Sequence, residues 1–167
     1  MRGAPWVAAL AVLATGLPGC GDGDAQVACG AVEHPEVQAG SHLIGGATPP
    51  VPYSSTPGTS GWHAAGAPRT GVFGAADPLS EPEIVKALEV GQVVAAYDPT
   101  RLAADATAQL EELAHDRFAG ALTVTPFSGD LGAPLVLNAW GVRQPCTGVD
   151  ADAIGAFVEE HAEPHPH

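Results

Sequence analysis

Three cysteines are the residues whose chemistry the sequence defines most directly: Cys20, Cys29 and Cys146. No two of them form a C-x-x-C pair, the spacing that thiol-disulfide exchange enzymes use. The hydroxyl of Ser60 lies in the sequence Gly-Thr-Ser-Gly, which is not the G-x-S-x-G elbow of hydrolases. These motifs therefore indicate neither thiol-disulfide exchange nor serine hydrolysis.

The first twenty residues resemble the leader of a bacterial lipoprotein. Arg2 precedes an apolar run over residues 6–17, which is too short to span a membrane at roughly 20 residues per crossing. The sequence Leu-Pro-Gly-Cys that follows resembles a lipobox, although Pro18 is less usual there than Ala or Ser. We expect residues 1–19 to be a signal peptide and Cys20 to carry the lipid, which would anchor the protein outside the cytoplasm on a bacterial membrane. An ordinary cleaved signal is the alternative.

With Cys20 lipidated, Cys29 and Cys146 remain as a candidate disulfide pair in an oxidising compartment. Closing so long a loop would stabilise the fold by about 4 to 5 kcal/mol in the chain-entropy model. Two free thiols are the alternative, because spacing in the sequence does not bring two sulfur atoms together.

The charge of the chain is strongly one-sided. Six Lys and Arg residues stand against 19 Asp and Glu residues, giving a formal net charge of −13. Such a surface repels nucleic acid and anionic headgroups, so we expect no nucleic-acid partner and a membrane contact through the lipid alone. A protein or small-ligand partner is expected, but its identity is not encoded in any motif.

The N-terminal third of the mature chain has little pattern. Residues 20–40 are small and acidic and predict a tether between membrane and domain. Residues 45–69 are rich in Pro, Gly, Ser and Thr, which excludes helices and disfavours long strands. A short extended piece is expected at residues 51–53. A loop region of this length is commonly functional or disordered.

Regular structure is expected from Ser80 onward. Ser80 with Glu83 is typical of a capping box, and an apolar face then continues until Gly91 ends the helix. Apolar periodicity and turn residues predict the remaining elements. These are strands at residues 92–97, 121–125 and 134–140, a helix from about Thr100, and a final helix from about Asp150. The expected fold is an α+β domain over residues 41–162, with a small mixed sheet covered by helices, a long Pro/Gly-rich N-terminal loop region, and a disordered tail at residues 163–167.

Five ordered motifs give this chain a family resemblance. It resembles the bacterial family catalogued as domain of unknown function 3105 over about residues 41–162. The motifs that carry the resemblance are Tyr53, the turn at residues 57–63 (Pro-Gly-Thr-Ser-Gly-Trp-His), the helix at residues 85–91 (Val-Lys-Ala-Leu-Glu-Val-Gly), Tyr97-Asp98-Pro99, and Ala139-Trp140-Gly141.

The resemblance implies a histidine cluster that handles a metal or a proton. Family members carry one histidine upstream of the turn, one at its end, and two that flank Leu-Glu in the helix. This chain has His42 and His63 at the first two positions, but Lys86 and Val90 at the helical pair. The reduced set that the resemblance leaves is His42, His63 and Glu89, and two histidines with one carboxylate are ligands that zinc or copper accepts.

Purely structural roles are also open for the same residues. His63 could anchor the turn through a hydrogen bond to backbone, and Glu89 could be an exposed acid. Glu89 near a helix C-terminus is poorly placed against the helix dipole, which suggests a specific partner. Lys86 one turn earlier, an arginine, or a backbone N–H of the turn at residues 57–63 could each be that partner.

Two hypotheses about the function follow from these residues. The first is a lipid-anchored, non-catalytic binding or accessory module, with a ligand surface that includes Tyr53, Ser60 and Trp62. The second is an extracytoplasmic protein that binds copper or zinc at the reduced histidine site. An enzyme is the weakest reading, because no acid and base pair is fixed by spacing.

Overall fold

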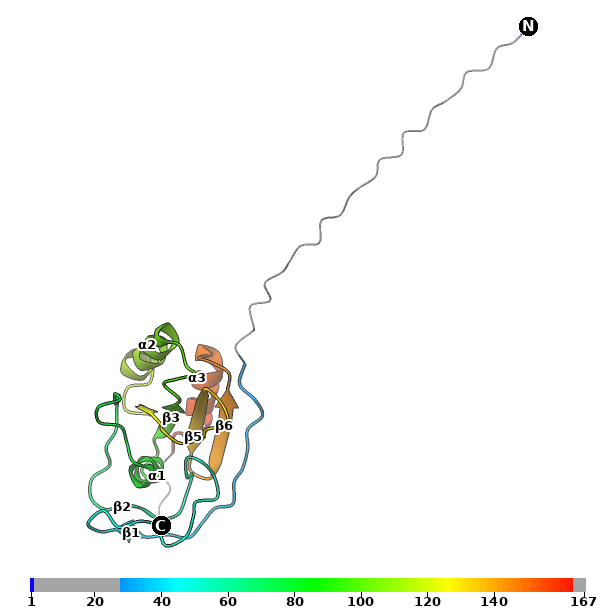
Figure 1. The fold of residues 1–167 in the computed structure, drawn as a ribbon. Coiled ribbons are helices and arrows are strands. Elements are labelled where there is room, and N and C mark those ends of the chain that lie inside the picture. The colour runs from blue at the N-terminus through cyan, green and yellow to red at the C-terminus, as the bar shows by residue number, and fades with distance from the viewer. Residues whose placement is uncertain (2–27, 164–167) are drawn as a thin grey trace.

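The computed structural model describes Met1 and residues 28–163, which form an α+β domain (Figure 1). The predicted fold class is confirmed. Residues 2–27, which hold Cys20 and most of the expected signal peptide, and residues 164–167 lie outside the described residues. Within residues 28–163, no helix has the length and apolarity that crossing a membrane requires.

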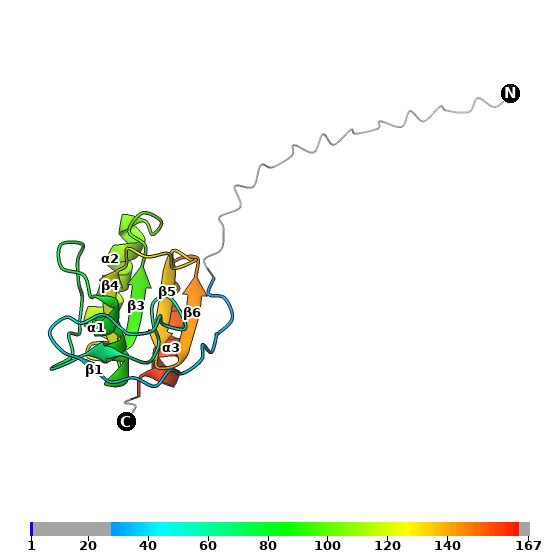
Figure 2. The ribbon, with the colours of Figure 1, turned by 60° about the horizontal axis from the view of Figure 1, so that its bottom comes forward.

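The main sheet has four strands in the order β4-β3-β5-β6. These are β3 (Val93–Tyr97), β4 (Leu122–Pro126), β5 (Leu135–Ala139) and β6 (Val142–Cys146). The central strand β3 pairs in parallel with β4 and antiparallel with β5, which in turn pairs antiparallel with β6. Figure 2 shows β3, β5 and β6 side by side. The small mixed sheet expected from the sequence is confirmed.

Helices cover both faces of this sheet. One face carries α2 (Ala104–Glu112), which continues into a π-helical turn (Leu113–Arg117), together with α3 (Ala151–His161). The other face carries α1 (Glu81–Glu89). Residues that alternate along a strand point to opposite faces. Accordingly, alternate residues of β3 join different apolar clusters: Val93, Ala95 and Tyr97 pack with α2 and α3, and Val94 packs with α1.

Local sequence signals fix the two ends of α1. The predicted capping box is present: the backbone N–H of Ser80 donates to Oε2 of Glu83 at 2.8 Å, and the Ser80 side chain accepts from the backbone N–H of Glu83. The Oγ of Ser80 also donates to Oε2 of Glu83, at 2.6 Å. Gly91 has φ +90°, a conformation that side chains disfavour and that ends the helix. The last turn of α1 is thereby held in register with the start of β3.

Three expectations about the strands and helices need correction. The edge strand β6 was not predicted, because Pro145 lacks an N–H and proline disfavours strand interiors. Residues 51–53, expected to be a short extended piece, begin with a bend at Val51 and join no sheet. Helix α2 begins at Ala104 rather than near Thr100, because the N–H and Oγ1 of Thr100 donate to the Asp98 carboxylate and close a turn first.

Residues 28–43, which we call the strap, run along the outer side of β6 and then pass under the sheet (Figure 1). The predicted disulfide between Cys29 and Cys146 is present and joins cysteines with a sequence separation of 117. Backbone hydrogen bonds continue the contact, from Gly30 N–H to the Pro145 carbonyl and in both directions between Glu33 and Arg143. The strap thus supplies the hydrogen bonds that the outer edge of β6 would otherwise lack.

Candidate metal centre

A small two-stranded sheet places two histidines next to each other. The strap ends in β1 (His42–Leu43), which pairs in parallel with β2 (His63–Ala64), and the register sets His42 opposite His63. The two imidazole rings meet edge to face with centroids 4.8 Å apart. Each strand has only two residues, so the pairing serves chiefly to fix these two side chains.

Glu89, the last residue of α1, completes a group of three possible metal ligands. One ligand atom from each of His42, His63 and Glu89 lies within 4.8 Å of the others. The structure therefore brings together all three residues that the family resemblance nominated. Among the described residues, this is the one group of three or more His, Cys, Asp or Glu side chains close enough to share an ion.

The buried ring of His63 is oriented by the turn that precedes it. Its Nδ1 lies 2.9 Å from the Gly61 carbonyl oxygen, which can only accept, so Nδ1 carries the hydrogen and donates. Burial lowers the pKa of His63 below its usual value, against the opposing effects of the Gly61 carbonyl and the Glu89 carboxylate. The neutral ring therefore directs the lone pair of Nε2 toward Glu89 Oε2, 3.1 Å away. An imidazole held by a backbone carbonyl through one nitrogen is a typical ligand through the other.

Glu89 is buried and has a cationic neighbour. Its Oε2 accepts a hydrogen bond from Lys86 Nζ at 2.8 Å, and both side chains are about nine-tenths buried. Of the partners considered from the sequence, Lys86 is confirmed, and the exposed-acid reading is wrong because Glu89 is 9% exposed. Val90 is the half-buried cap residue of α1 and offers no ligand atom.

His42 is the exposed member of the group, whereas His63 and Glu89 are buried. The site is thus closed on the side of the helix and reachable from solvent on the side of β1. A metal ion could arrive through the His42 side without any rearrangement of the sheet core.

The other residues predicted for a ligand surface hold the turn at residues 57–63 together. Tyr53 Oη donates to the Trp62 carbonyl at 2.5 Å, and burial together with the Glu81 charge raises the pKa of Tyr53. Ser60 is fully buried and its Oγ accepts from the Gln38 N–H at 2.9 Å. Trp62 is half-buried. These residues support the position of His63 from one side of the turn.

Sequence reasoning missed Gln38 and Gly61. Gln38 uses its backbone N–H on Ser60, its Nε2 on the Pro52 carbonyl and its Oε1 on the Ser54 N–H, so it ties the strap to the loop on both sides. Gly61 has φ +101°, a conformation that side chains disfavour. A Cβ at Gly40 would overlap the backbone of Gly61, so the segments around these two residues can approach this closely only because Gly40 lacks a side chain. A single Gln and two glycines in a Gly-rich stretch give no recognisable signal.

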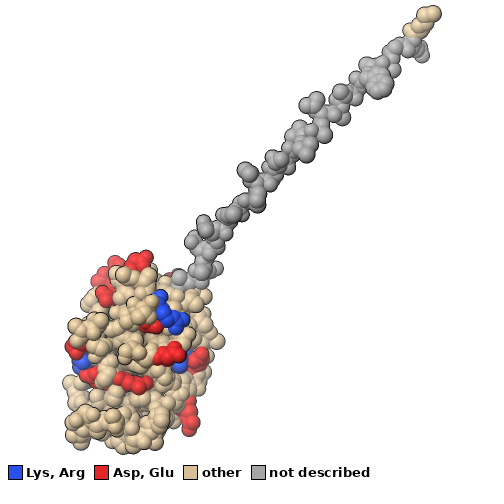
Figure 3. Space-filling view, viewed as in Figure 1, with Lys and Arg blue, Asp and Glu red and all other residues tan. Residues whose placement is uncertain are grey.

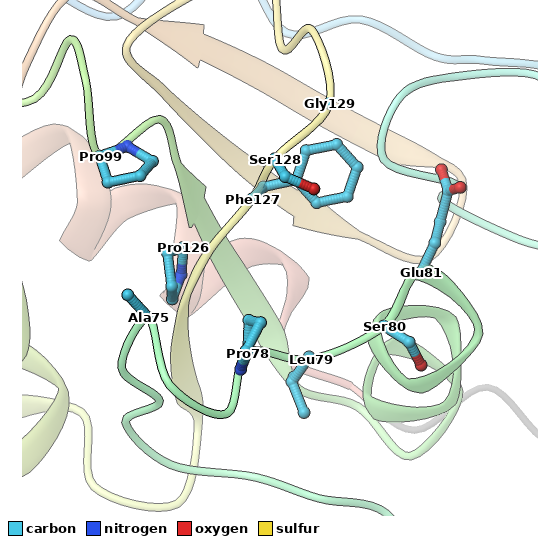
Figure 4. Close-up of a pocket in the computed structure, with 10 residues that line it drawn as sticks. All are labelled: Ala75, Pro78, Leu79, Ser80, Glu81, Pro99, Pro126, Phe127, Ser128 and Gly129. Carbon is cyan, nitrogen blue, oxygen red and sulfur yellow. The ribbon is translucent and has the colours of Figure 1, made fainter.

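One largely apolar cavity lies at the other end of α1, away from Glu89. A hollow of about 390 Å³ is lined mainly by apolar residues near the helix start, including Pro78, Leu79 and Phe127 (Figure 4). Glu89 stands at the opposite end of the nine-residue helix, roughly 13 Å along its axis. The cavity and the metal-ligand group are therefore separate features.

Charge on the surface matches the acidic composition. In the view of Figure 3, acidic side chains are spread over the face and the basic ones occur singly, without a continuous basic patch. Several of the basic side chains are neutralised locally. Arg69 contacts Asp77 and Glu83, at 2.6 and 3.1 Å, and Arg143 contacts Glu33 at 3.3 Å.

Comparison with known proteins gives one match. Residues 47–167 match a family model described as "Protein of unknown function (DUF3105)". No curated protein and no solved structure matches the chain. The matched residues include the turn, His63, Lys86 and Glu89, and begin after His42.

Proposed function

The chain belongs to the DUF3105 family of proteins of unknown function, and from that premise we propose that it is an extracytoplasmic, lipid-anchored binding module whose ligand is one zinc or copper ion. The ion would be held by His42, His63 and Glu89. The module would have no catalytic activity of its own.

One observation carries the metal assignment: the buried pair His63 Nε2 and Glu89 Oε2 face each other at 3.1 Å, with His42 alongside. Donor atoms bound to one tetrahedral zinc ion lie roughly 3.3 Å apart, given bond lengths of about 2.0 to 2.1 Å. The buried pair is already near that separation. The ligand atom of the exposed His42 lies within 4.8 Å of the other two. A shift of roughly 1.5 Å or less would bring it to the separation that zinc requires.

The donor set suits this class of metal. Two imidazoles and one carboxylate match borderline cations such as Zn²⁺ and Cu²⁺ better than Mg²⁺ or Ca²⁺, which take oxygen ligands. The Gly61 carbonyl holds the His63 tautomer in which Nε2 carries no hydrogen, so no proton has to leave that ring when an ion binds. Because His42 is exposed, a water molecule could reach a bound ion from that side.

Metal content of the full-length protein in detergent tests this assignment. His165→Gln and His167→Gln would be present in every sample, so that the tail binds no ion. After exposure to Zn²⁺ or Cu²⁺ and desalting, we expect about one ion per chain, and His63→Ala should lose it. His115→Ala, which removes an exposed histidine outside the group, is the matched control. Equal metal content in His63→Ala and the control would contradict the assignment.

The anchoring part of the proposal rests on the leader sequence and is supported by the disulfide, which is typical of oxidising compartments. Cys20→Ser should prevent lipidation and move the protein from the membrane fraction to the soluble fraction of cells. Continued recovery of Cys20→Ser in the membrane fraction would show that another feature holds the protein there.

A further inference from the structure

Lys86 is the only lysine in the chain, and it sits against the proposed metal site. Its side chain is 10% exposed, and Nζ lies 2.8 Å from Oε2 of Glu89. The same oxygen lies 3.1 Å from Nε2 of His63. One carboxylate oxygen thus faces both the ammonium and the imidazole nitrogen.

This arrangement provides a positive charge where the ligand group needs one. A buried carboxylate without a partner is costly, and an imidazole lone pair facing a carboxylate oxygen adds repulsion. The Lys86 ammonium neutralises Glu89 directly and so allows the two acceptors to stay close in the absence of a metal ion.

An ammonium cannot become a ligand, because it has no lone pair. A divalent ion bound by His63 and Glu89 would lie a few ångströms from Nζ, and the two positive charges would repel strongly in a partly buried site. The flexible four-carbon stem of lysine allows the ammonium to swing toward solvent while its methylene groups stay packed.

We propose that Lys86 is a built-in competitor for the metal: it holds Glu89 in the metal-free state, leaves Oε2 when the ion binds, and thereby weakens the affinity of the site. This rests on the metal-binding function proposed above. The consequence is a site that binds the ion less tightly than its three ligands alone would, and that keeps its geometry when empty.

The first test is the dissociation constant for Zn²⁺, measured by calorimetric titration of the full-length protein in detergent with His165→Gln and His167→Gln in every sample. Lys86→Met keeps the length of the stem and removes the charge, so the dissociation constant should fall about tenfold or more. Arg101→Met removes the same charge from an exposed loop and should leave it unchanged.

The second test uses the protein with Lys86 unchanged, so it does not depend on whether a Lys86 variant folds. Because Lys86 is the only lysine, an amine-directed acetylating reagent followed by peptide mass spectrometry reports on its Nζ alone among side chains. Zn²⁺ should raise the labelling of Lys86 several-fold by releasing it from Glu89.

The outcomes separate the two proposals. Tighter binding by Lys86→Met together with metal-enhanced labelling supports the competitor role, and so does binding that appears only in Lys86→Met. If wild type binds Zn²⁺ but neither the variant nor the labelling responds, Lys86 is no competitor and the metal site stands. If neither protein binds Zn²⁺ or Cu²⁺, the metal-binding function itself is overturned, and the competitor role with it.

Discussion

The sheet core and the turn-rich region before it are stabilised in different ways. In the core, β3 to β6 pair along regular ladders and bury apolar side chains on both faces. In residues 28–72, order comes from one disulfide, two short bridges to β6 and a set of side-chain to backbone hydrogen bonds. Both histidines of the candidate site come from the second region, and only Glu89 comes from the helix that packs on the core.

This contrast suggests a division of labour. The core supplies most of the folding free energy and presents the end of α1 at a fixed position, while the strap and the turn bring ligands to it. If so, a change in the core should cost stability without changing the site, and a change in the strap should cost both.

The largest effect is expected from removing the disulfide, which links the two regions. Cys29→Ser with Cys146→Ser opens a loop of 117 residues and should lower the free energy of unfolding by about 4 to 5 kcal/mol in the chain-entropy model. Because the strap carries His42, zinc affinity should fall as well. Urea unfolding and zinc titration would measure the two losses, with oxidised wild type as the reference. Unchanged zinc affinity would show that the hydrogen bonds of Gln38 hold the strap by themselves.

A cavity in the core should separate stability from binding. Leu137 of β5 is fully buried, so Leu137→Ala should cost about 3 kcal/mol, seen as a lower urea midpoint. Well below that midpoint, zinc affinity should stay at the wild-type value. Val51→Ala changes an exposed side chain of the turn-rich region and should stay within about 0.5 kcal/mol of wild type. A loss of zinc affinity in Leu137→Ala would mean that core packing also sets the ligand geometry.

The smallest effect concerns the pH dependence of stability that Glu83, in the first turn of α1, contributes. Burial acts to raise the pKa of Glu83, but hydrogen bonds from Ser80 and Arg69 outweigh it, so the net pKa is lowered from 4.5. A lowered carboxyl pKa contributes stability that is present above pH 4.5 and is lost as the pH falls through the folded-state value.

The free energy of unfolding should therefore fall less between pH 6 and pH 3 in Glu83→Gln than in wild type. The difference should be less than about 1 kcal/mol, as measured by thermal unfolding. Glu112→Gln, which changes an exposed carboxylate of α2, is the control. An acid limb equally steep in Glu83→Gln and wild type would assign the acid sensitivity to other carboxylates.

The sequence predicted the core well because its signals are local. The capping box of α1, the apolar run of β3 and the periodicity of α3 each lie within a dozen residues, and all three elements formed as expected. Strand β6 was not predicted because it depends on hydrogen bonds to segments outside it, β5 on one side and the strap on the other. Proline is unfavourable inside a strand, but at this edge Pro145 needs only its carbonyl, which accepts a hydrogen bond from the Gly30 N–H.

The candidate site was less predictable, for a physical reason. His42, His63 and Glu89 meet through a two-residue parallel bridge and a helix end, and neither leaves a spacing pattern in the sequence. The family resemblance nominated the three residues, but their proximity depends on tertiary contacts such as those of Gln38. Lys86 was recognised as one of several possible partners of Glu89, and only the fold selects it.

The covalent link at Cys29 also has a mechanical meaning. Tension applied to the chain before Cys29 passes through the disulfide into Cys146, at the end of an edge strand, before it can reach the rest of the strap. The segment that positions His42 is therefore shielded from such a load. A protein pulled from its N-terminal side would keep its histidines in place for as long as that bond is intact.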